Sequence, residues 1–183
     1  MALIRLINLA LLSVCLLALP VQAWPLRPSE AGFAYYHNRS VDVGRDDLLG
    51  SGLAGRLGLP LHSGVWHRLD LGLEIGLGGF AGHGSGFEAA LAPGLRLYLN
   101  PDGRWRPYLE AGAGISYNDL DIHELGTGFN FLTFAGLGLR LPLNEAASLD
   151  LGLRLRHISN AGLDERNHGV TSHQLQAGLA WRF

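Results

Sequence analysis

Residues 69–77 read Leu-Asp-Leu-Gly-Leu-Glu-Ile-Gly-Leu, so aliphatic side chains alternate without a break with glycine or acidic side chains. Side chains two positions apart share one face of a β-strand, and this stretch therefore predicts a strand with a uniformly aliphatic face. The same alternation recurs in residues 95–99, 109–117, 137–141 and 149–155, and again up to the final Phe183. The pattern indicates an all-β protein.

The alternating segments are separated by turn-forming sequences, such as Asn-Pro-Asp-Gly at 100–103 and Pro-Leu-Asn-Glu at 142–145. Several segments are longer than about ten residues, which is long for a globular sheet but suits tilted membrane strands. The predicted strands span residues 30–38, 49–61, 65–79, 87–99, 105–117, 127–141, 146–159 and 171–183.

The face opposite the aliphatic one carries glycine and charge, including Arg96, Glu110, Arg140 and Arg154. A soluble sandwich or lipocalin-like barrel would need those charges outside. An eight-stranded membrane barrel instead fills its narrow interior with small residues and paired charges, exposes its aliphatic face to lipid and closes its edges. The terminal aromatic Phe183 also resembles the last strand of bacterial outer-membrane proteins. We therefore expect an eight-stranded antiparallel transmembrane β-barrel, with residues 146–159 ending at the outer leaflet.

The N-terminal residues 1–23 have the features of a secretory signal peptide. Arg5 precedes an apolar run over 6–19, and the small-residue pattern Val-Gln-Ala follows at 21–23. The run is short for a transmembrane anchor, so we expect residues 24–183 to form the barrel in the outer membrane of a Gram-negative bacterium. Cys15 is the only cysteine, which excludes disulfides and thiolate metal sites from the mature chain. The net charge of −2, with no basic block, argues against nucleic acid as a partner.

One polar cluster continues a row that should face lipid. His157 and Ser159 follow the alternating leucines of residues 149–155 on the same face. Polar groups facing hydrocarbon cost free energy and suggest function, although the row could simply have reached the headgroups. A histidine beside a serine can take its hydroxyl proton and make it a nucleophile, while backbone N–H groups near Asn160 and Gly162 could hold an oxyanion. The substrate would be an ester within the outer leaflet.

The run His-Ile-Ser-Asn-Ala-Gly-Leu at 157–163 resembles the signature of the lipid A 3-O-deacylase family, the PagL type, and residues 107–114 resemble its fifth strand. The resemblance implies an outer-membrane esterase that removes the 3-O-linked acyl chain of lipid A in lipopolysaccharide, without a metal or other cofactor. It makes Ser159 the nucleophile, His157 the base, and Asn160 and Gly162 the oxyanion-hole positions. Lipid A and outer-membrane lipid would be its partners, and a homodimer stays open by analogy.

The sequence departs from that family at one position. Residues 167–171 read Asn-His-Gly-Val-Thr, so Thr171 stands where the resemblance expects the triad glutamate. A hydroxyl could accept a hydrogen bond from His157 but would not stabilise an imidazolium by charge. Asp164, Glu165 and His173 are alternative polar neighbours.

Several interpretations therefore stay open: a slow deacylase, an active one with a relocated acid, and a barrel that binds lipid A without cutting it. A structural or adhesive barrel is a further alternative, although it would have no reason to carry the His-x-Ser-Asn run. A pore is disfavoured because side chains fill an eight-stranded barrel.

Overall fold

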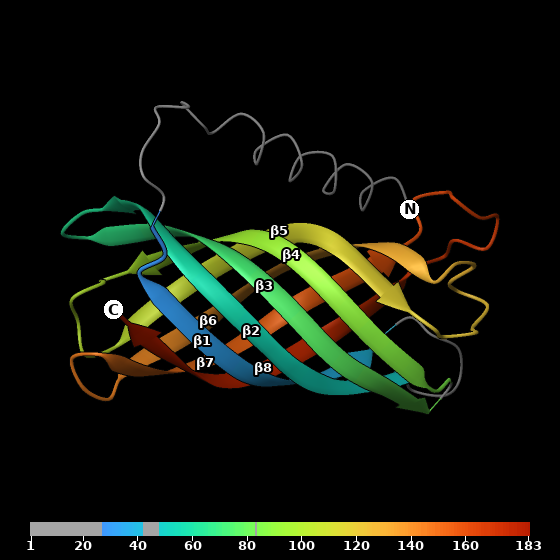
Figure 1. Cartoon of the computed structure of the whole chain (residues 1–183), viewed down its shortest axis with the longest axis horizontal. Helices are drawn as coiled ribbons and strands as arrows, with labels where there is room; N and C mark the ends of the chain where they lie inside the picture. Colours follow the sequence, from blue (N-terminus) through green and yellow to red (C-terminus); the bar gives the residue numbers. More distant parts are fainter. Residues whose placement is uncertain (1–26, 42–47, 83) are drawn as a thin grey trace.

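The computed structural model describes residues 27–41, 48–82 and 84–183, so the predicted signal peptide lies outside the described residues. Antiparallel strands pair in chain order, and β8 pairs with β1 to close a barrel (Figure 1). The strands are β1 (Glu30–Ser40), β2 (Leu48–Ser63), β3 (His67–Gly82), β4 (Gly86–Leu99), β5 (Arg106–Asn118), β6 (Phe129–Pro142), β7 (Ala147–Ser159) and β8 (Val170–Arg182). Within these ranges, no helix has the length and hydropathy needed to cross a bilayer.

Side-chain exposure alternates along the strands as the sequence predicts. On β7, Leu151, Leu153 and Leu155 are exposed on the outer wall, whereas Arg154 and Arg156 are buried in the lumen. A barrel in water would invert this arrangement, because it would bury aliphatic side chains and expose charged ones. The eight-stranded transmembrane architecture is confirmed.

The connection between β3 and β4 differs from the sequence-based prediction. The predicted strands end at residue 79 and resume at 87, but β3 continues to Gly82 and β4 begins at Gly86. The glycines of this stretch carry no side chain, so they give no alternation signal. Phe80 points into the barrel, at 9% exposure, and adds a large apolar residue to the inner face where the pattern predicts small or charged ones.

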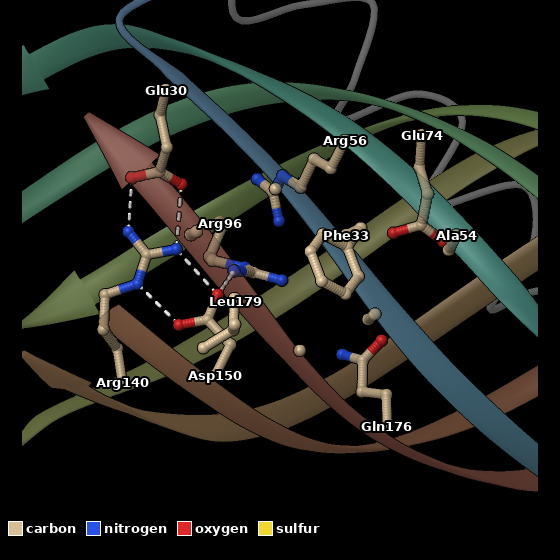
Figure 2. A pocket seen from close by; sticks show the side chains of 14 residues that line it. Glu30, Phe33, Ala54, Arg56, Glu74, Arg96, Arg140, Asp150, Gln176 and Leu179 are labelled. Carbon is tan, nitrogen blue, oxygen red and sulfur yellow. Dashed lines mark hydrogen bonds and ion pairs between the residues drawn. The ribbon is translucent and has the colours of Figure 1, made fainter. Parts of the chain in front are cut away.

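Paired charges fill the lumen near the end of the barrel where β1 begins and β8 ends. The Arg140 guanidinium, 1% exposed, donates to the carboxylates of Glu30 and Asp150 (Figure 2). Arg96 in turn lies 2.8 Å from an Asp150 oxygen and 2.9 Å from a Glu110 oxygen. A buried charge is tolerated when it is paired and hydrogen-bonded, as these groups are.

The ionic network continues toward the other end of the lumen. Arg154 bridges Glu74 and Glu110, each at 2.7 Å, and Arg156 pairs with Glu88. The paired interior charges that the sequence predicts, among them Glu110 and Arg154, are therefore confirmed. This network places the glutamates inside the barrel, on the opposite side of the wall from the outward-facing row of β7.

An apolar cluster closes the lumen above the charges. It combines inward-facing strand residues with three residues of the β5–β6 loop: Leu48, Phe80, Ile158 and Val170 with Leu120, Ile122 and Leu125. Below it, the cavities lined by the ionic residues measure about 40 and 20 Å³. Ionic and apolar side chains thus occupy much of the described lumen, as expected of an eight-stranded barrel.

The connections at the two ends of the barrel differ in length. The end that holds the C-terminus of β7 carries the long loops at residues 119–128 and 160–169, besides the short connection from Gly82 to Gly86. The opposite end carries the shorter turns at 64–66, 100–105 and 143–146. Transmembrane barrels have short periplasmic turns and longer extracellular loops, so β7 ends at the outer leaflet.

Candidate active site on the outer wall

His157 and Ser159 lie on the outer wall at the end of β7. In the strand register, His157 stands between Thr133 of β6 and Thr171 of β8, and Ser159 is opposite Phe131. Both side chains are half-buried and continue the exposed leucine row. Residues two apart on a strand lie about 7 Å apart along the chain, which places the imidazole and the hydroxyl next to each other on one face.

Thr171 contacts the imidazole directly. The Nδ1 atom of His157 and the Oγ1 atom of Thr171 are 3.0 Å apart and form a hydrogen bond. The Thr171 carbonyl accepts the Val41 N–H at 2.9 Å, which fastens this end of β8 to the end of β1. The residue at the position of the expected acid therefore meets the histidine, but through a neutral hydroxyl.

Gly169 lies against the other edge of the same imidazole. Its φ is +74°, and a Cβ added there would stand 2.6 Å from Cε1 and 2.9 Å from Nε2 of His157. Only glycine adopts this conformation readily and leaves that space open. The Gly169 N–H donates to the Glu124 carbonyl at 3.1 Å, so the β5–β6 loop holds the glycine in place. The sequence contained the signal, in the Asn-His-Gly order of 167–169, but sequence reasoning gave Gly169 no role.

A tight turn follows Ser159. The Leu163 N–H donates to the Asn160 carbonyl at 3.1 Å, and the two central residues, Ala161 and Gly162, have φ of 54° and 90°. Two consecutive left-handed residues define a type I′ turn. A non-glycine residue such as Ala161 is strained in that region, and strain of this kind is concentrated at functional sites.

The side chain of Asn160 holds this turn from inside. It is fully buried, its Oδ1 accepts the Gly162 N–H at 2.9 Å, and its Nδ2 donates to the Arg166 carbonyl at 2.9 Å. The backbone N–H of Asn160 donates to Oδ1 of Asn167 at 3.0 Å. The N–H groups of Asn160 and Gly162, which the sequence suggests as oxyanion donors, thus have protein acceptors. The N–H of Ala161, between them, donates to no acceptor within the described residues.

The other polar residues that the sequence offers as partners of His157 are engaged or exposed away from the imidazole. Asp164 accepts the Arg166 N–H at 2.9 Å and lies 3.7 Å from the Arg166 guanidinium, so it is engaged within its own loop. Glu165 is exposed on that loop. His173 is exposed on the outer wall, one position further along the row of Thr171. In the part of the chain that the structure describes, no three His, Cys, Asp or Glu side chains gather as a metal site would require.

Sequence comparison identifies relatives of the chain. Residues 52–180 match the family model described as lipid A 3-O-deacylase (PagL). The lipid A deacylase PagL of Bordetella bronchiseptica is 35% identical over 121 residues, covering 61% of this chain and 63% of the relative. That of Pseudomonas aeruginosa is 32% identical over 116 residues, covering 62% of each chain. The aligned stretches thus span less than two thirds of either relative.

Structure comparison gives the same fold. The crystal structure of the outer membrane enzyme PagL is similar with a TM-score of 0.59 and 24% identity, covering 82% of this chain and 98% of that one. Neisserial surface protein A is similar with a TM-score of 0.58 and 16% identity, covering 84% of this chain and 96% of that one. The family model covers most of the barrel strands, including both strands that carry the site. The chain is an outer-membrane β-barrel that belongs to the lipid A 3-O-deacylase (PagL) family.

Proposed function

We propose that this barrel is a lipid A 3-O-deacylase, an esterase that removes the 3-O-linked acyl chain of lipid A in lipopolysaccharide. The observation that carries the proposal is the 3.0 Å contact between His157 Nδ1 and Thr171 Oγ1, beside Ser159 on the lipid-facing wall. An ester whose carbonyl lies just below the headgroups of the outer leaflet would reach this site from the side, without entering the barrel. Lipid A carries such esters and is the substrate named for the curated relatives.

The residues divide the reaction between them. Nδ1 of His157 bonds to Thr171, and we assign Nε2 as the atom that accepts the Ser159 hydroxyl proton as Oγ attacks the ester carbonyl. Collapse of the tetrahedral intermediate breaks the bond to the sugar oxygen, which takes the proton from the imidazolium. Water then attacks the acyl-serine, with His157 again as the base, and releases the 3-hydroxy fatty acid and the free serine.

The oxyanion would form next to the type I′ turn. Asn160 and Gly162 are the positions that the family resemblance assigns to this role, and both N–H groups have acceptors within the turn. The Ala161 N–H is the further donor of the same turn, and we include it in the proposed oxyanion hole. Donors fixed in advance stabilise a developing charge strongly, because they need no reorganisation during the reaction.

A second candidate function is lipid A binding without cleavage. The observation that favours it is the neutral Thr171, which orients His157 but supplies no charge. In a serine hydrolase of another fold, replacing the triad acid lowers kcat by about 10⁴ and leaves residual catalysis. A slow deacylase and a non-cleaving binder therefore differ in rate, so the rate must be measured.

Mass spectrometry of lipid A from Gram-negative cells that express the protein tests the proposal. We expect loss of one 3-hydroxyacyl chain with the wild-type protein and none with Ser159→Ala or His157→Ala. Ser148→Ala, which changes a lumen-facing serine of the same strand, is the matched control and should retain activity. A lipid A profile that the wild-type protein leaves unchanged in cells and in detergent micelles would exclude the hydrolase and support the binder.

A further inference from the structure

The chemistry of the outer wall changes around the barrel at the level of the site. On the side of β4, β5 and β6, the outward residues near the outer rim are aromatic. Phe87 and Tyr117 have ring centroids 5.9 Å apart, and Phe129 and Phe131 have centroids 5.7 Å apart. Phe131 is the cross-strand partner of Ser159. An apolar, aromatic surface therefore adjoins the candidate nucleophile on one side.

On the other side of the site the same outer wall carries an arginine and two histidines. His173 of β8 pairs with Arg39 of β1, and His37 lies two residues further along β1 on the same face. All three side chains are exposed, and His37 Nδ1 lies 3.2 Å from Oγ of Ser51 on β2. We call His37, Arg39 and His173 the cationic strip. It begins next to Thr171 and runs across β8 and β1, which are neighbours in the barrel wall (Figure 1).

This polarity is not a general property of the rim or of these strands. Further along β1 and β8 the outward residues are apolar, and Phe33 stacks on Trp181 with ring centroids 5.5 Å apart. An arginine facing lipid costs little near an interface, about 0–1 kcal/mol, so cost alone does not explain the strip. The position of the strip suggests a role in binding. Basic groups occur on one side of the candidate nucleophile, and aromatic rings occur on the other side at the same end of the strands.

We propose that the cationic strip binds a phosphate on the headgroup of the substrate, while the acyl chain to be removed lies over the aromatic side. This inference rests on the proposed function and adds an orientation to it. A guanidinium presents a rigid fork of N–H donors that matches phosphate oxygens in pairs, and an imidazole adds a further donor. An amphiphile with an anionic sugar headgroup and acyl chains matches this polarity, and it would bring its ester carbonyl over Ser159.

Binding is best measured in a variant that cannot turn over. Ser159→Ala protein in detergent micelles is titrated with diphosphorylated lipid A and with the same lipid A after removal of its phosphates, and complexes are counted by native mass spectrometry. We expect the phosphorylated form to bind about tenfold more tightly, the order of one charge-assisted phosphate contact. Adding Arg39→Gln should reduce that preference at least fivefold, and Arg39→Gln with His173→Gln should abolish it. Arg39→Lys, which keeps the charge but loses the fork, should fall between.

Arg104→Gln is the matched control, because Arg104 is an exposed arginine in the turn at the opposite end of the barrel. It should leave the preference unchanged. Equal binding of the two lipids, or an unchanged preference in the Arg39→Gln protein, would refute the proposal that the cationic strip binds phosphate. Hydrolysis by the protein with Ser159 intact is measured separately. Absence of hydrolysis would refute the proposed function, whereas the phosphate preference of the Ser159→Ala protein tests the role of the strip independently.

Discussion

The Nδ1 atom of His157 lies 3.0 Å from the Oγ1 atom of Thr171, and the two residues are direct partners in the β7–β8 ladder. The strand pairing fixes their distance, so the contact does not depend on loop placement. A longer acidic side chain at the same position would start from the same backbone and point along the same outward row. The register thus holds the residue at the position of the expected acid against His157, although that residue has no charge.

Restoring a carboxylate at this position should accelerate the reaction. In Thr171→Glu we expect kcat to rise at least tenfold, because a carboxylate on Nδ1 stabilises the imidazolium that forms in the transition state. The measurement is the rate of 3-hydroxy fatty acid release in micelles. Thr133→Glu, on the opposite neighbour of His157, is the control. Equal gains from the two variants would show a general charge effect, and no gain from Thr171→Glu would show that another residue supplies the acid.

A methyl group at Gly169 should displace the imidazole of His157. In Gly169→Ala the new Cβ would come within 2.6 Å of His157 Cε1 on a backbone with φ of +74°. A displacement of about 1 Å can cost about 10²-fold in rate, and we expect a loss of that order with the barrel still folded. Folding is checked by the heat-dependent shift of the barrel on gel electrophoresis. Gly55→Ala, where a Cβ meets nothing within 4 Å, should be silent, and full activity in Gly169→Ala would refute the role of the glycine.

Removing the Asn160 side chain should loosen the turn after Ser159. Asn160→Ala leaves the Gly162 N–H and the Arg166 carbonyl without their partners, and each lost buried hydrogen bond costs about 1–3 kcal/mol. We expect faster proteolysis within residues 160–169 and lower activity. Asn144→Ala is the comparison, because Asn144 accepts two backbone N–H groups in the turn at the opposite barrel end. Protease resistance equal to wild type would contradict the proposed role.

The ionic network of the lumen should dominate stability. Arg140→Ala leaves Glu30 and Asp150 facing each other without their shared cation, and breaking a buried ion pair costs about 3–5 kcal/mol. Urea unfolding in micelles, followed by tryptophan fluorescence, should show this loss. Arg104→Ala, on the exposed turn, should change the free energy of unfolding by less than about 0.5 kcal/mol. A similar result for both variants would show that the lumenal pairs contribute little.

The closed lumen should not conduct ions. Lumenal cavities of about 40 and 20 Å³ sit below an apolar cluster that includes Leu120, Ile122 and Leu125. Reconstitution into planar bilayers should give no stepwise conductance under a transmembrane voltage. Steps that persist in a preparation purified to homogeneity would show that the interior opens.

The fold could be predicted from the sequence because its physical signal is local. Alternation over residues 69–77 and 149–155 defines both the strands and their lipid-facing side, and the observed strand ends lie within a few residues of the predicted ones. The predicted connection between the third and fourth strands was too long, because β3 continues to Gly82, where glycines carry no alternation and Phe80 faces inward.

The placement of the candidate site could also be predicted from the alternation of side chains along the strands, which put His157, Ser159 and Thr171 on one outward face. The contacts that surround these residues could not be predicted from the sequence. The bond from Gly169 to Glu124 joins loops that are distant in the sequence, and the contact of Asn160 with Asn167 depends on how the turn closes. The alternation of side chains along a strand carries no information about either contact. The acceptors found for the Asn160 and Gly162 N–H groups were missed for the same reason.

The outward placement of His157 and Ser159 also determines how the rate of a reaction there would depend on the amount of lipid. Reactants that meet on the flank of the barrel are confined to a leaflet, so the relevant concentration is a mole fraction among neighbouring lipids rather than a molarity. Mixing inert phospholipid into vesicles at constant volume would slow turnover, whereas diluting the whole suspension would not. Such surface dilution follows from geometry alone, since neither the ester nor the freed acid has to leave the plane of the membrane.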